Sequence, residues 1–295
     1  MPGWHFHLDA WLLVAGLAGG YWLALRRERA RRRLAHGDAE VGPVATRGQV
    51  DAFGSALVLM WGVSDWPVHD LAEGYLYSFH MVQHLVLTLG VALLLVVGTP
   101  SWLARRLLSP PGLLRVVRWL ARPVPALIQF NLILVLSHWP VVVEATLLHH
   151  PLHFVAHAVL LVSGILMWLP IASPLPEVPR LAPPLQMLYL FLQTIVPTIP
   201  ASFLTFGSKP LYPIYETFPR LWGISALTDQ LTAGLIMKVG AGFYLWIVIA
   251  VIFFRWYAHE EQAGSAYQPD VLLWHDVERE LRRLDAQSKS PPPPG

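Results

Sequence analysis

Two pairs of histidines with the same spacing are the residues of this chain best suited to chemistry. His80 and His84 lie four residues apart in SFHMVQHLVL, and His153 and His157 repeat the spacing in HHPLHFVAH. Residues four apart on an α-helix share a face and are separated by about 6 Å of rise, so two imidazoles can converge on one ion. The two pairs together predict a metal site with up to four nitrogen ligands.

The composition limits which ligands such a site can use. The chain contains no cysteine, which excludes disulfides, thiolate metal sites and cysteine nucleophiles. Histidine, methionine, aspartate and glutamate remain as ligands. Because imidazole suits copper, zinc, nickel and iron alike, the ligand type does not identify the metal.

Other polar residues are candidates for the same site. His138 lies near the end of an apolar segment, and His149 directly precedes the second histidine pair. Asp229 and Gln230 open the last apolar segment; Asp229 is a possible ligand, a partner that orients an imidazole, or a helix cap. Met237 lies two turns deeper and is either a soft ligand suited to Cu(I) or a packing residue.

The stretch WPVHDLAEG contains acidic residues at a different spacing. Asp70 and Glu73 are three residues apart, as in a capping box. This spacing predicts the start of a helix rather than a ligand pair.

The segments that position these residues are strongly apolar. Hydrophobic residues make up 55% of the 295-residue chain and charged residues 14%, against about 25% in an ordinary soluble domain. A membrane-spanning helix needs about 20 mostly apolar residues. We therefore expect an all-α polytopic membrane protein with seven transmembrane helices, near Leu8–Leu25, Gln49–Val63, Tyr75–Val97, Val124–Val143, Leu152–Leu169, Leu185–Phe206 and Ala226–Phe254.

The positive charges predict how these helices are oriented. Lys and Arg accumulate on the cytoplasmic side of a membrane, and 18 of the 21 follow the first, third, fifth and seventh segments. This places the N-terminus outside and the C-terminus in the cytoplasm, in a plasma or inner membrane. Ten of the 13 histidines then lie on the outer side, namely His5, His7, His69, His80, His84, His138, His149, His150, His153 and His157. Polar groups at membrane depth are costly and tend to mark function.

Two parts of the chain follow from this topology. Residues 1–258 are predicted to form the transmembrane domain, and residues 259–295 a cytoplasmic tail. The tail contains DVLLWHDVERELRRL, an amphipathic stretch typical of a short surface helix, and ends in KSPPPPG, which is typical of disorder.

Proline and glycine predict local features of the last two helices. Pro197 and Pro200 in TIVPTIP predict a kink in the sixth helix. Gly234, Gly240 and Gly242 predict a small-residue surface for close packing in the seventh.

Several motifs resemble those of a known family. HMVQHL, SHWP, LHFVAH, GILMWLP and DQLTAGLIM, in this order between about Trp66 and Tyr257, are similar to the seven-helix CtaG-type assembly factors of caa3-type cytochrome c oxidase. The resemblance implies a protein that is not an enzyme, matures a copper-containing oxidase and handles copper. It implies oxidase subunits and membrane lipid as partners, and no nucleic acid. The motif residues that carry over are His80, His84, His138, His153, His157, Asp229 and Gln230.

Two other functions stay open at this point. An intramembrane zinc hydrolase would use three ligands and a bound water, with Asp229 as acid or base. A membrane haem protein would use histidines on facing helices as axial ligands, but a pair on one helix leaves one histidine without an axial role.

Overall fold

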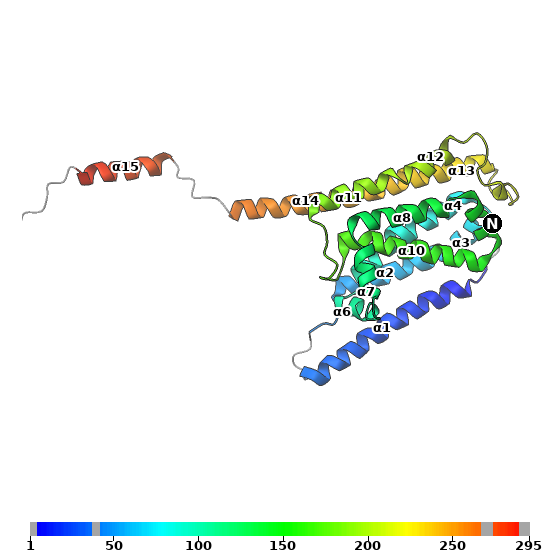
Figure 1. Ribbon diagram of the computed structural model, residues 1–295, viewed down its shortest axis with the longest axis horizontal. Coiled ribbons are helices and arrows are strands. Elements are labelled where there is room, and N and C mark those ends of the chain that lie inside the picture. Colours follow the sequence, from blue (N-terminus) through cyan, green and yellow to red (C-terminus); the bar gives the residue numbers. More distant parts are fainter. Residues whose placement is uncertain (1–4, 37–41, 267–273, 289–295) are drawn as a thin grey trace, which may run out of the picture. The chain divides into compact units, whose positions relative to one another are not determined.

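The computed structural model describes residues 5–36, 42–266 and 274–288, and these ranges contain helices but no strand (Figure 1). The chain divides into two units, residues 1–252 and residues 253–295. The predicted all-α membrane fold is confirmed. The predicted boundary near residue 258 stays a prediction.

The described residues form α-helices, two π-helices and one 3-10 helix. In chain order they are α1 (Leu8–His36), α2 (Arg47–Ser64), α3 (Val68–Gly74), α4 (Tyr77–Leu85), the π-helix η2 (Val86–Val91), α5 (Ala92–Gly98), α6 (Ser101–Leu107), α7 (Leu113–Leu120), α8 (Pro123–Ser137), α9 (Pro140–Leu148), α10 (His150–Ala172), α11 (Pro183–Ile195), α12 (Thr198–Phe206), the 3-10 helix η3 (Pro213–Glu216), α13 (Ala226–Leu235), the π-helix η4 (Ile236–Gly240), α14 (Ala241–Ala266) and α15 (Trp274–Ser288).

Five helical segments of the described residues are long and apolar enough to cross a membrane. They are Leu8–Ala35, Tyr77–Gly98, His150–Ala172, Pro183–Phe206 and Ala226–Gln262. The pair α7 and α8, bent by 86°, makes a sixth if it forms one span. The number of seven spans and the orientation of the termini stay predictions.

The predicted fourth span is divided in the structure. The sequence predicts one helix over 124–143, but α8 ends at Ser137 and α9 begins at Pro140. Proline disfavours the helical conformation of the residue before it, and Trp139 is extended with φ −70° and ψ 133°. The boundary places His138 at the end of α8 rather than inside a continuous helix.

Proline also breaks the sixth predicted span, as expected. α11 ends at Ile195 and α12 starts at Thr198, so the break falls at Val196 and Pro197. The helix is interrupted at the predicted proline, and the kink itself stays a prediction.

A π-helical segment, η2, directly follows the first histidine pair. A change of hydrogen-bond register within a helix leaves carbonyls in need of other partners. The Nε1 of Trp168 on α10 donates to the carbonyl of Thr88 at 3.1 Å, and the hydroxyl of Tyr244 on α14 donates to that of Leu89 at 3.1 Å. Both donors fix η2 to neighbouring helices.

Close contact between η2 and α10 brings the two histidine-bearing helices together. A Cβ added at Gly164 would lie 2.9 Å from the carbonyl oxygen of Thr88, so only glycine allows this approach. Deeper in the same region, Ala92, Phe130, Met167 and Trp168 form part of a buried apolar core.

The predicted small-residue surface of the seventh span is present only at its start. A Cβ at Gly234 would lie 2.5 Å from Oγ1 of Thr205 on α12, whereas a Cβ at Gly240 would make only ordinary contacts and one at Gly242 would meet nothing within 4 Å. The close packing is therefore confined to α12 and α13.

The histidine-bearing ends of the helices lie at one end of the first unit. Figure 1 shows α3, the start of α4, the end of α12 and the start of α13 near the N-terminus, and α6 and α7 at the opposite end. At that opposite end Arg105 forms an ion pair with Glu177, with Nε and Oε1 3.0 Å apart.

The second unit contains α15, which covers most of the predicted amphipathic stretch. Its surface carries ion pairs spaced along the helix, such as Arg282 with Glu278 at 2.7 Å. The start of the predicted stretch and the proline-rich end lie outside the described residues.

Candidate metal centre

Three of the four paired histidines meet in the interior of the first unit. His80, His84 and His157 each offer one ring nitrogen, and these nitrogens all lie within 4.8 Å of one another. The Nε2 atoms of His84 and His157 are 3.1 Å apart. His80 and His84 are buried and His157 is partly buried. We call these three residues the inner cluster.

The geometry of the inner cluster fits a transition-metal ion. An ion held tetrahedrally about 2.0 Å from two nitrogens keeps them about 3.3 Å apart, close to the separation of His84 and His157. The Nδ1 atoms of His80 and His84 are buried without a hydrogen-bond partner among the described residues. Buried polar atoms normally have partners, so these orphaned nitrogens favour a site that binds something further.

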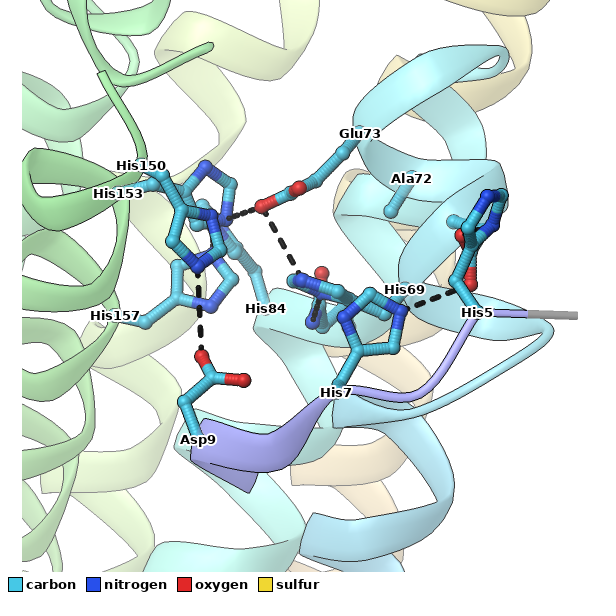
Figure 2. A network of polar contacts seen from close by, with 12 residues as sticks. His5, His7, Asp9, His69, Ala72, Glu73, His84, His150, His153 and His157 are labelled. Carbon is cyan, nitrogen blue, oxygen red and sulfur yellow. Dashed lines mark hydrogen bonds and ion pairs between the residues drawn. The ribbon is translucent and has the colours of Figure 1, made fainter. Parts of the chain in front are cut away.

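His153 lies beside the inner cluster but turns toward another residue. Its ring centre is 4.2 Å from that of His157 and 5.5 Å from that of His80. Its Nε2 lies 3.3 Å from Oε1 of Glu73 on α3, as Figure 2 shows. The structure therefore places the fourth predicted ligand between the inner cluster and a carboxylate.

His138 approaches the cluster from the other side. Its ring centre is 5.7 Å from that of His84, but its Nδ1 donates to the carbonyl of Leu134 at 2.7 Å. Its Nε2 lies 3.3 Å from the sulfur of Met81. The predicted soft ligand Met237 lines the same cavity as Met81, His84 and His138.

Asp229 and Gln230, at the start of the last span, both accept hydrogen bonds from backbone N–H groups. The carboxylate of Asp229 accepts the backbone N–H of Tyr77 at 2.6 Å and that of Ser78 at 3.0 Å. Asp229 thus caps α4, the helix that carries His80 and His84, and not its own helix, which Ser225 caps. The side chain of Gln230 accepts the backbone N–H of Leu211.

The loop histidines lie at the edge of the site. His149 is exposed and precedes the first residue of α10. The Nε2 of His150 lies 3.5 Å from Oδ2 of Asp9 (Figure 2).

Sequence reasoning missed a group on α3. The capping-box interpretation of Asp70 and Glu73 is wrong, because α3 begins at Val68 and has no side-chain cap. His69 and Glu73 instead lie one turn apart, with Nε2 and Oε1 separated by 3.3 Å. The four-residue spacing that marks the histidine pairs is present here too, but only the fold shows that this pair faces His153.

Burial shifts the pKa values of His69 and Glu73. It lowers the pKa of His69 to about 4 and raises the pKa of Glu73 above its ordinary value, because it disfavours both charged forms. The Nδ1 of His69 contacts the side-chain amide of Gln83 at 3.1 Å.

The segment that precedes α1 covers α3. His5 and His7 both contact the carboxylate of Asp70, at 2.9 and 3.0 Å, and the ring centre of His7 is 4.6 Å from that of His69. The indole of Trp11 donates to Asp65 at 3.0 Å. Histidines far apart in sequence thus form a continuous line from the surface to the inner cluster.

Fold and site together define a polytopic helical membrane protein with a buried cluster of imidazoles. Residues 19–259 match the family described as cytochrome c oxidase caa3 assembly factor (Caa3_CtaG). The match covers most of the chain, which therefore belongs to this family of assembly factors. Comparisons with curated proteins and with solved structures gave no match.

Proposed function

We propose that this protein binds copper at His80, His84 and His157 and supplies it to cytochrome c oxidase during assembly. Membership of the family establishes the assembly role, and the convergence of three ring nitrogens within 4.8 Å is the observation that supports metal binding. Copper is favoured because the acceptor in the proposal is a copper-containing oxidase.

The donor set suits an ion that must be released again. Imidazole binds copper without the thiolates that make binding very tight, and the chain has no cysteine. Met81 and Met237 beside His84 add polarizable sulfur of the kind that Cu(I) accepts. These features support transfer rather than permanent storage.

Asp229 is not free to act as a catalytic acid or base. A zinc hydrolase would need a free acid or base, yet both carboxylate oxygens of Asp229 accept backbone N–H groups of α4. This carboxylate stabilises the helix that presents the ligands.

A deletion strain tests the function directly. Loss of the protein should lower the activity and the copper content of the oxidase while its subunits are still synthesised. His80→Ala and His157→Ala should reproduce most of that loss, because each removes one of the three converging nitrogens. Oxidase purified from each strain is assayed for turnover and for copper by elemental analysis.

Two comparisons make the result specific. Removal of the chain after Tyr267 should have a milder effect than either histidine change, because the inner cluster remains intact. The copper proposal fails if oxidase from the deletion strain carries its full copper complement and normal turnover. Zinc in the purified protein together with amide hydrolysis would also contradict it.

A further inference from the structure

The carboxylate of Glu73 lies between two imidazoles outside the inner cluster. Its Oε1 is 3.3 Å from Nε2 of His69 and 3.3 Å from Nε2 of His153 (Figure 2). Within the described residues neither that oxygen nor either ring nitrogen of His153 makes a hydrogen bond. The His153 side chain is 4% exposed, so these are buried polar atoms without a hydrogen bond.

This arrangement points to a ligand rather than to packing. Two ligand atoms of a tetrahedral ion with bonds of about 2.0 Å lie about 3.3 Å apart, which is the separation on each side of Glu73 Oε1. A buried carboxylate and imidazole that were only structural would be expected to form a hydrogen bond of ordinary geometry. The contacts of Glu73 instead have the spacing of coordinating atoms.

We propose that His69, Glu73 and His153 form an outer binding position, from which a divalent transition-metal ion passes to the inner cluster. The outer position offers a carboxylate and imidazoles, a set that suits divalent ions such as Cu²⁺ or Zn²⁺. The passage rests on the proposed function, because it ends at His80, His84 and His157.

Distances and exposure define the direction of passage. Glu73 is 27% exposed and His153 is 4% exposed, so the position runs from the surface inward. His153 then lies beside both His157 and His80, with ring centres 4.2 and 5.5 Å away. His153 can therefore exchange an ion between the carboxylate and the inner nitrogens by a change of ligands.

Charge favours capture at the outer position. Asp9 in the first turn of α1 and Asp70 on α3 lie close to it, and the Asp70 side chain is 11% exposed. Carboxylates at the mouth of a buried site raise the local concentration of cations. The three residues of the inner cluster carry no carboxylate, so the negative charge lies at the entrance.

The test is the rate at which copper enters the purified, untagged protein. The protein is mixed with Cu²⁺, the reaction is stopped with EDTA at increasing times, and the copper that stays bound is measured. Glu73→Gln preserves the shape of the side chain and removes its charge. We expect this variant to load about tenfold more slowly and to bind one ion fewer per chain at equilibrium.

Glu144→Gln is the matched control, because Glu144 is an exposed glutamate on α9. It should load like the natural protein. A Glu73→Gln variant that also loads at the natural rate overturns the proposal. A change of folding is checked by the thermal unfolding of both variants, which should agree.

Failure of the inner cluster would give a different result. The variant with His80→Ala, His84→Ala and His157→Ala should still bind one ion at the outer position. If this triple variant binds as much copper as the natural protein while Glu73→Gln binds none, the outer position stands as a site, but the passage and the proposed function fail. If Glu73→Gln behaves like the natural protein while the triple variant does not, only the proposal of the outer position fails.

Discussion

Asp229 shows how a single side chain supports the site without touching an ion. Its carboxylate accepts two backbone N–H groups at the start of α4, more than 150 residues earlier in the chain. The first turn of a helix leaves N–H groups without helical partners, and a buried carboxylate satisfies them strongly. The sequence indicated Asp229 as ligand, orienting partner or cap, and the contact identifies the helix that it caps.

Asp229→Ala should therefore lower the free energy of unfolding by about 2 kcal/mol, since it removes a cap that makes two charge-assisted hydrogen bonds. Thermal unfolding in detergent measures the loss. Asp51→Ala, which changes an exposed aspartate on α2, should leave the midpoint within about a degree. Equal effects of the two changes would argue against the cap.

Helix packing determines whether the two histidine pairs meet. The spacing of His80 with His84 and of His153 with His157 predicts which residues share a face, but it does not predict which faces oppose. In the structure the answer depends on Gly164, whose missing Cβ lets α10 approach the π-helical segment η2. No sequence pattern that we used indicates a π-helix, so this feature could not be predicted.

Gly164→Ala should separate the two helices at this contact. The added Cβ would lie 2.9 Å from a backbone oxygen, which cannot move aside as a flexible side chain would. We expect a loss of about 1–3 kcal/mol in the free energy of unfolding, and weaker copper binding.

Gly242→Ala is the control for this substitution, because a Cβ there meets nothing within 4 Å. Both variants are compared by thermal unfolding and by copper titration. Gly164→Ala that unfolds and binds copper like the Gly242→Ala protein would show that the close approach is not needed.

At the scale of the whole molecule, the sequence predicted the fold class better than it predicted how the helices are arranged. Composition and apolar runs predict a helical membrane protein because burial in lipid requires them. The division of the fourth predicted span at Pro140 has a local cause, the effect of proline on Trp139, but the meeting of His69, Glu73 and His153 depends on tertiary contacts between segments about 80 residues apart. Local spacing contains no information on such contacts.

The predicted orientation can be tested in this cysteine-free chain. Ser208→Cys and Ser265→Cys each introduce one thiol, on opposite sides of the membrane if the positive charges follow the usual bias. An impermeant thiol reagent applied to intact cells should label only the first variant. Labelling of the second variant alone would reverse the orientation and place the inner cluster near the cytoplasm.

The copper content of the purified, untagged protein tests the central claim most directly. After incubation with copper and dialysis, the natural protein should retain copper, and the variant with His80→Ala, His84→Ala and His157→Ala should retain at least one ion fewer per chain. His259→Ala changes a histidine outside the candidate site and should retain the natural amount. Equal copper in the natural protein and the triple variant would contradict the account, because the three converging nitrogens would then hold no ion.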